Sequence, residues 1–406
     1  MIWCGIDWAE RHHDVALVDD DGKLIAKRRI GEDLSGCTAL LELLTEHRAI
    51  SNGECATPIA IETANGLLPA ALLASGFTVY AINPLAASRY RDRYAVSRAK
   101  SDAGDALVLA NVLRTDRSAH RPIPADSELV RAVRVLARAR QDAVWERQQA
   151  QNKLRSLLRE YYASALASFD DLAAPVAREV LTVAPTPDHA RRLRRTTLRA
   201  AVIRAGRQRG IDAEVERILT GLRREQLRQP LLVEHAMGQQ ALAHLRALTT
   251  AADNADCLQT AMTQRFEQHP DSELITSLPG LGEVLGARVL GELGDDRVRF
   301  ADARSVKAFA GTAPLTRASG TRRVVSMRAV RNKRLGQAGY LWAFSLLRQS
   351  PGARAHHDRR RQRGDSHAAA LRNLSNRFMG ILFHCLQQHV PYDEHKAFPP
   401  PKTQTT

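Results

Sequence analysis

The stretch Cys4-Gly5-Ile6-Asp7-Trp8 carries an aspartate inside an apolar run that predicts a β-strand. A charge within such a strand costs free energy unless it is paired or bound to a metal. The apolar run Ile59-Ala60-Ile61 ends in Glu62 and shows the same feature. Two acids at predicted strands therefore indicate that the first part of the chain holds a metal-binding or catalytic site.

The residues around these two strands alternate between short strand and helix patterns. Strands are predicted within 2–18 and over 24–30, 59–62 and 78–83, and helices over 35–46, 66–75 and 102–114. Pro84 is expected to end the last strand, and Ser101 is placed to cap the last helix. This alternation predicts an α/β domain with a mixed sheet over residues 1–125.

Asp102 and Asp105 lie three residues apart at the start of the last predicted helix, so they share one helix face. With Asp7 and Glu62 they make four carboxylates. Such a set can hold two Mg²⁺ ions about 3.5–4 Å apart, which stabilise the attacking and leaving oxygens of a phosphodiester. A plainer interpretation stays open, because acids at a helix start are often caps and Asp7 can pair with a nearby cation.

The chain of 406 residues is basic, with 59 Lys and Arg against 44 Asp and Glu and a net charge of +15. This excess favours a polyanionic partner, nucleic acid before membrane, because neutralising phosphates releases condensed counterions. The alternative is a basic protein from a GC-rich genome, in which arginine is common. Aromatic residues make up only 5%, which argues against a base-stacking platform.

No signal peptide or membrane span is predicted, because residues 1–10 lack a basic segment and no stretch approaches ~20 apolar residues. The cysteines are scattered without CxxC spacing, which fits a reduced cytoplasm and argues against a zinc site. They are Cys4, Cys37, Cys55, Cys257 and Cys385.

After Pro122 and Pro124, long helical patterns with little glycine predict a helical or coiled-coil region over 126–268. Two apolar seams run through this region. They comprise Leu129, Val133, Leu136, Ala143, Ala150, Leu154 and Leu157, and then Leu231, Leu242, Leu245, Ala252, Leu258, Met262 and Phe266. An antiparallel pair within one chain and a dimer are equally compatible with these seams.

Residues 269–397 return to mixed composition and predict a third, mainly helical domain, followed by a disordered tail over 398–406. The run Leu278-Pro279-Gly280-Leu281-Gly282 before a helix is typical of a helix-hairpin-helix turn. Its glycines, Gly280 and Gly282, would let backbone N–H groups approach a phosphate. An ordinary glycine turn between helices is the alternative.

Ser319 precedes a glycine and lies among Arg317, Arg322 and Arg323. A serine in such surroundings can attack or bind a phosphate, although a simple basic loop also explains the pattern. The basic segment that follows adds further candidate contacts to nucleic acid. They are Arg328, Arg331, Lys333 and Arg334.

Gly5-Ile6-Asp7, Ile61-Glu62-Thr63 and Lys100-Ser101-Asp102-Ala103-Gly104-Asp105 together resemble the DEDD pattern of a family of insertion-sequence transposases. The later order Pro-Gly-x-Gly, Gly-x-x-Pro, Ser-Gly and a basic helix resembles the C-terminal transposase domain of that family. The resemblance spans nearly the whole chain and extends to Piv-type invertases. It implies an N-terminal domain of the RuvC-like, ribonuclease H fold.

By this resemblance Asp7, Glu62, Asp102 and Asp105 are catalytic ligands of Mg²⁺ or Mn²⁺, and Ser319 is a nucleophile that holds DNA covalently. The implied partners are DNA of the element ends and target, a structured guide (bridge) RNA, and further copies of the chain in a dimer or tetramer. The implied location is the bacterial cytoplasm, at the nucleoid.

Three rival interpretations remain. A hydrolytic Holliday-junction-type nuclease would use the same acids without the serine. A non-enzymatic nucleic-acid-binding protein would explain the charge alone. An actin-like ATPase also begins with a Gly-x-Asp strand, but the chain offers no Gly-rich phosphate loop after a second such strand.

Overall fold

The structure, a computed structural model, describes residues 1–47, 57–94, 102–320 and 322–399. Within these ranges the side chains of residues 93, 94, 102, 103 and 323 are not described. The chain divides into two compact units, Met1–Ala125 and Asp126–Thr406. The first unit ends at the residue where the sequence places its first domain boundary.

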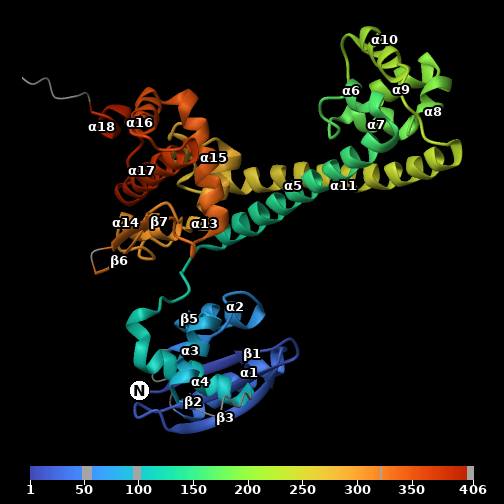
Figure 1. The fold of residues 1–406 in the computed structure, drawn as a ribbon. Coiled ribbons are helices and arrows are strands. Elements are labelled where there is room, and N and C mark those ends of the chain that lie inside the picture. Colours follow the sequence, from blue (N-terminus) through green and yellow to red (C-terminus); the bar gives the residue numbers. More distant parts are fainter. Residues whose placement is uncertain (48–56, 95–101, 321, 400–406) are drawn as a thin grey trace, which may run out of the picture. The chain divides into compact units, whose positions relative to one another are not determined.

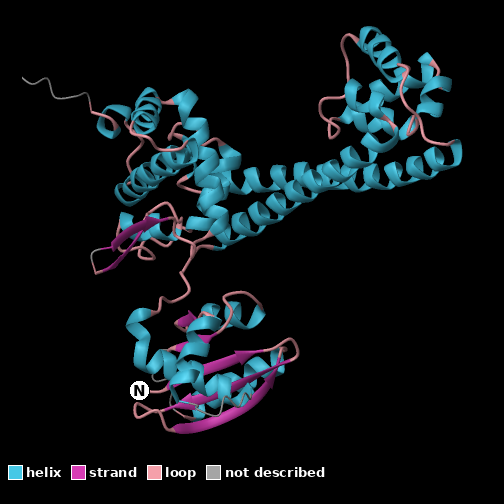
Figure 2. Cartoon of the chain, in the orientation of Figure 1, coloured by secondary structure: helices cyan, strands magenta, loops and turns pink. Residues whose placement is uncertain are grey.

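The first unit is built on a five-stranded sheet in the order β3-β2-β1-β4-β5. Figure 2 draws its strands in magenta and the surrounding helices in cyan. Its strands are β1 Trp3–Trp8, β2 His12–Val18, β3 Leu24–Gly31, β4 Ile59–Ile61 and β5 Val79–Ala81. The pairs β1-β2 and β2-β3 are antiparallel, whereas β1-β4 and β4-β5 are parallel. The mixed sheet expected from the sequence is therefore present.

Helices cover both faces of this sheet. They are α1 Leu34–Glu46, α2 Leu67–Ala74, α3 Pro84–Tyr94 and α4 Asp102–Asp116, followed by the 3-10 helix Arg117–Ala119. One core joins Ile6 and Ile61 to leucines of α1 and α2, and a second joins Ala60 to leucines of α4. Because successive strand residues point to opposite faces, these cores define an α1–α2 face and an α3–α4 face.

Helix α3 is an element that the sequence analysis missed. Pro84 was expected to end a strand, and it also occupies the first position of this helix. Asn83 stands before it, and the Asn83 side-chain oxygen accepts a hydrogen bond from the Leu85 N–H at 2.8 Å. A capping residue followed by proline is a recognised start signal for a helix, so this helix could have been predicted from the sequence.

Two long helices, α5 Glu128–Tyr161 and α11 Leu231–Glu267, pack along each other in the second unit (Figure 1). The start of α5, at Val133, shares a core with Phe266 near the end of α11. The end of α5, at Leu157, shares another core with Leu245 nearer the start of α11. The pair is therefore antiparallel within one chain, which is one of the two arrangements that the sequence left open.

Short helices join the end of α5 to the start of α11 and build the second of these cores. They are α6 Ala163–Ser168, α7 Pro175–Val183, α8 Pro187–Arg192, α9 Arg195–Arg204 and α10 Ile211–Leu222. Throughout the described part of the chain, no helix is both long enough and apolar enough to cross a membrane.

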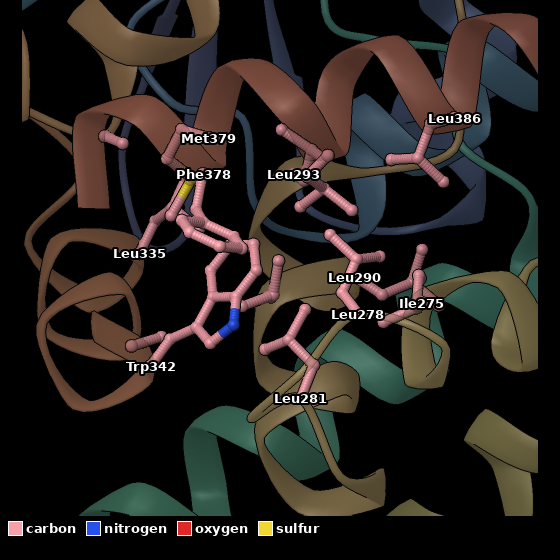
Figure 3. Packing of buried hydrophobic residues seen from close by; sticks show 14 of the residues in the cluster. Ile275, Leu278, Leu281, Leu290, Leu293, Leu335, Trp342, Phe378, Met379 and Leu386 are labelled. Atoms are coloured by element: carbon pink, nitrogen blue, oxygen red, sulfur yellow. The ribbon is translucent and has the colours of Figure 1, made fainter. Parts of the chain in front are cut away.

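The C-terminal part of the second unit packs around the other end of the α5–α11 pair. Its elements are α12 Ser272–Thr276, α13 Glu283–Leu293, α14 Ala303–Phe309, β6 Leu315–Ser319, β7 Arg322–Ser326, α15 Lys333–Gln349, α16 Pro351–Gln362, α17 His367–Gln388 and α18 Glu394–Ala397. Figure 3 shows Leu278 and Leu290 packed with Trp342 and Phe378 in its core. This part is mainly helical, as predicted, but the hairpin β6-β7 was not predicted.

The prediction of a disordered tail over 398–406 is wrong for its first residue, Phe398. The Phe398 ring centroid lies 4.6 Å from the Arg377 guanidinium and 5.9 Å from the ring centroid of Phe378. An aromatic side chain that finds apolar and cationic neighbours gains free energy by leaving water. Residues 400–406 lie outside the described residues.

Candidate functional site

Asp7 and Glu62 stand at the carboxyl ends of two neighbouring parallel strands. The register pairs Ile6 with Ile61, so the next residue on each chain segment is one of the two acids. Ile6 and Ile61 point into the core on the α1–α2 face. Strand alternation then turns Asp7 toward the α3–α4 face, and Glu62 directly follows the last residue of β4; both acids are half-buried. The structure thus brings these two predicted site residues together.

Helix α4 crosses β1 at Gly5 with almost no space between the two backbones. A Cβ atom on Gly5 would lie 2.0 Å from the Ala106 carbonyl oxygen and 2.5 Å from the Ala110 nitrogen. Only a residue without a side chain permits this approach. Asp105 immediately precedes Ala106, so the crossing brings it to the face of the sheet that carries Asp7.

The Asp105 carboxylate is buried and forms an ion pair with Arg91 of α3. The Arg91 Nε atom is itself buried and has no hydrogen-bond partner among the described residues. Asp102 is the first residue of α4, three residues before Asp105, and its side chain lies outside the description. The helical acids therefore occupy the predicted helix start, and one of them is held by a cation.

A further acid of this face, Asp14, was missed by the sequence analysis. It lies opposite Asp7 in the antiparallel register of β1 and β2 and is only 8% exposed. Arg29 holds it with two hydrogen bonds, 3.1 Å from Nε and 2.7 Å from Nη2. Asp14 precedes the apolar run 15–18 on its strand, so the criterion that selected Asp7 would also have found it.

The carboxylates of Asp7, Glu62 and Asp105 are the oxygen donors that Mg²⁺ and Mn²⁺ prefer, so their chemistry fits such an ion. Among the side chains that the structure describes, no three His, Cys, Asp or Glu residues gather closely enough to hold a metal. The side chain of Asp102, the fourth predicted ligand, is not in that set. The four-acid metal site therefore stays a prediction.

Ser319 is the last residue of β6, in the exposed hairpin that β6 forms with β7. It lies directly opposite Arg322, and Arg317 stands two residues before it on the same strand. Both arginines therefore share a face of the hairpin with Ser319, and the side chain opposite is expected about 4.5–5.5 Å away. Gly320, with φ +55°, begins the turn. A hydroxyl between two exposed guanidinium groups can meet a phosphate.

The glycine turn before α13 packs against α15. Gly280 has φ +79°, and its N–H donates to the Gln349 side chain at 2.8 Å. Trp342 Nε1 donates to the Pro279 carbonyl at 2.8 Å. Glu283 stands in the first turn of α13, directly after Gly282, and places negative charge where a phosphate would bind. These contacts account for the turn by packing, and phosphate binding at Gly280 and Gly282 stays a prediction.

The basic residues after the hairpin have different surroundings. The Arg334 guanidinium pairs with Asp142 of α5 at 2.8 Å and lies 5.1 Å from the ring centroid of Trp145. Arg331 instead packs on Gly311 and donates to the Arg328 carbonyl at 2.6 Å, and Lys333 is exposed. Arg334 thus fastens α15 to α5, whereas Arg331 and Lys333 have no carboxylate partner in the described chain.

Comparison with known proteins gives two family matches. Residues 4–163 match a model of DEDD transposases of the IS110 type, described as a transposase. Residues 272–358 match a model of the transposase IS116/IS110/IS902 family. The first segment contains all four predicted acids, and the second contains Ser319 and the other residues predicted to contact nucleic acid.

Individual relatives match along nearly their whole length. The mini-circle putative transposase for IS117 of Streptomyces coelicolor is 57% identical over 403 residues, which is 98% of this chain and 97% of the relative. An uncharacterized 44.8 kDa protein of insertion element IS116 from Streptomyces clavuligerus is 30% identical over 100% of this chain and 98% of its own length. An uncharacterized 42 kDa protein of insertion element IS900 from Mycobacterium paratuberculosis is 29% identical over 96% and 97%.

Proposed function

This chain belongs to the IS110/IS116/IS902 family of transposases, and we propose that it cuts and rejoins DNA with Ser319 as nucleophile and a metal-bound set of acids. The proposal rests on the position of Asp7 and Glu62 at the ends of adjacent parallel strands, with Asp7 on the sheet face that α4 approaches at Gly5. A mixed sheet with an acid-bearing helix packed on it is consistent with a RuvC-like, ribonuclease H fold.

In this proposal Asp7, Glu62, Asp102 and Asp105 hold Mg²⁺ or Mn²⁺. Bound ions of this kind polarise a scissile phosphate and stabilise the oxygens that attack and leave. Two cations of the chain already neutralise acids on this face, Arg91 at Asp105 and Arg29 at Asp14. These ion pairs hold the two carboxylates in fixed orientations on that face.

The serine step conserves the number of phosphodiester bonds. The Ser319 oxygen attacks phosphorus, the bond from phosphorus to the leaving strand breaks, and the leaving oxygen receives a proton. The hydroxyl of another strand then attacks the phosphoserine and releases the serine. Arg317 and Arg322, on the same hairpin face, are placed to stabilise the charge that develops on the phosphate oxygens.

Two further parts of the proposal come from the family resemblance. A structured guide RNA would select the DNA, and a dimer or tetramer would complete sites from more than one chain. The net charge of +15 suits a protein that binds more than one nucleic acid. The proposal places the chain with its DNA in the bacterial cytoplasm, at the nucleoid.

The test compares variants of the full chain on labelled DNA that carries the junction of the element, with its flanking transcript and Mg²⁺. Asp7→Asn is expected to abolish cleavage, and Ser319→Ala to abolish both cleavage and joined product. Ser326→Ala is a matched control, because Ser326 lies on the same hairpin, opposite Leu315, and should keep full activity. Cleavage that survives in Ser319→Ala but not in Asp7→Asn would instead indicate a hydrolytic nuclease.

A further inference from the structure

A cavity of about 310 Å³ lies between the base of the hairpin, α15 and α17. Met327, which directly follows β7, forms part of its wall, so the cavity adjoins the end of the hairpin opposite to Ser319. The polar residues of its wall are Thr312, Arg331, Lys333, Gln337, Tyr340, Arg372 and Ser375.

The wall of this cavity carries three cationic side chains and no acid among its described residues. Arg331 donates to the Arg328 carbonyl at 2.6 Å, and Arg372 donates to the Met327 sulfur, a weak acceptor, at 3.3 Å. In the described part of the chain, none of Arg331, Lys333 and Arg372 forms an ion pair. Cations gathered without a counter-charge repel one another, and an anion in the cavity relieves this repulsion.

Ser375 of α17 adds a buried hydroxyl to the same wall. It is 1% exposed, and its Oγ atom has no hydrogen-bond partner among the described residues. A Cβ atom on Gly339 would lie 2.6 Å from this oxygen, so glycine at that position leaves space beside the hydroxyl. A buried polar group without a partner costs free energy, and a ligand that accepts its hydrogen bond recovers that cost.

The start of α15 contributes one more donor to the cavity, the side-chain amide of Gln337. The Arg288 Nη2 atom donates to Gln337 at 3.2 Å, and because arginine only donates, the atom it meets is the amide oxygen. The amide N–H₂ of Gln337 therefore remains to donate to a ligand. Lys333 and Gln337 lie in the first turns of α15, where the helix dipole is positive.

We propose that this cavity binds a phosphate group of a nucleic-acid strand, with Arg331, Lys333 and Arg372 around it and Ser375 as a buried donor. Five strand residues at about 3.3 Å each separate the cavity from the hairpin end that carries Ser319, or about 16 Å. The bound phosphate is therefore not the one that Ser319 attacks, and it positions the strand. The inference rests on the proposed function only for the source of the phosphate.

The first arm uses inorganic phosphate and the full chain, with thermal unfolding as the readout. Phosphate is expected to raise the Tm of the wild type and of Ser319→Ala, because a ligand of the native state stabilises it. Arg372→Gln is expected to reduce that rise. Ser375→Ala should raise the Tm of the ligand-free protein, since an unpaired buried hydroxyl is removed, and should reduce the rise with phosphate. A lower ligand-free Tm together with an undiminished rise in Ser375→Ala would overturn the assignment.

The second arm titrates duplex DNA and duplex RNA at several salt concentrations. Loss of one phosphate contact in Arg372→Gln is expected to reduce the slope of log K against log salt concentration by about one. The matched control is Arg348→Gln, an exposed arginine of α15 outside the cavity, which should leave the slope unchanged. A reduced slope with either polymer supports the phosphate site and identifies which nucleic acid supplies the phosphate. Equal behaviour of the two variants with both polymers overturns it. Because this arm does not involve Ser319, it can succeed even if the serine step is refuted.

Discussion

Replacing Gly5 by alanine tests whether the crossing of α4 over β1 builds the acidic site. The added Cβ would lie 2.0 Å from the Ala106 oxygen, and real Cβ contacts are essentially never shorter than 3.0 Å. Since the obstructing atoms belong to the backbone, α4 must move by about 1 Å. Overpacking of this kind costs about 3 kcal/mol, and a displacement of 1 Å at a catalytic site can cost about a hundredfold in rate.

Hydrogen exchange of the full chain, measured by mass spectrometry, reports the loss of stability in the segments around Gly5. A loss of about 3 kcal/mol corresponds to roughly a hundredfold faster exchange in peptides of β1 and α4. The control is Gly76→Ala, at a φ of +83° with nothing within 4 Å of its Cβ position, which strains the backbone without moving α4. Gly76→Ala should lose about 1 kcal/mol and keep its cleavage activity. If Gly5→Ala keeps both wild-type exchange and wild-type cleavage, the reasoning is refuted.

Two other substitutions probe buried charges. Arg91→Leu leaves the buried Asp105 carboxylate without its cation and should cost about 3 kcal/mol in thermal unfolding, partly restored by Mg²⁺, whereas Arg89→Leu on the exposed side of α3 should cost little. An unchanged Tm in Arg91→Leu would show that the pair is not stabilising. Burial is the largest single effect on the pKa of Glu292 and raises it, but the hydrogen bonds from Arg138 and Asn332 and the nearby arginine charges together lower that pKa below its usual value. Its stabilising contribution is therefore present at neutral pH and lost as pH falls through that lowered pKa. Glu292→Gln should cost about 1.5 kcal/mol at pH 7, because Arg138 is partly solvent-screened, and the cost measured by denaturant titration should shrink as the pH falls through the lowered pKa. A cost that is independent of pH would contradict this linkage.

The strands and the candidate acids of the first domain were largely predictable, because the strands are buried and apolar and the acids stand directly beside apolar residues. Ile6 and Ile61 are apolar on a strand, so Asp7 and Glu62 stand out beside them. Register is a property of pairing, however, and no pattern within one strand says that Ile6 lies beside Ile61. The contact of Gly5 with α4 is likewise invisible in the sequence, because any turn or bulge also explains a glycine.

The sequence analysis missed elements whose residues are mostly exposed, because such elements show little apolar periodicity. Thr316 and Arg317 of β6 are exposed, so the hairpin is held by its partner strand and has no apolar alternation to reveal it. The seams of α5 and α11 predicted two long helices, but the same seam serves a partner in the same chain or in another. Sequence alone also cannot tell an arginine that packs inside the protein from one that binds nucleic acid. Arg334 was predicted to contact nucleic acid, and its guanidinium instead packs on Trp145.

The most direct test of the serine mechanism is the chemical identity of the protein–DNA adduct. The full chain is incubated with labelled element DNA, its flanking transcript and Mg²⁺, denatured, and digested with nuclease and trypsin for mass spectrometry. The account predicts a nucleotide linked through phosphate to Ser319 in the tryptic peptide of residues 318–322, absent in Ser319→Ala. Cleaved DNA with no covalent adduct, or an adduct on another residue, would contradict it.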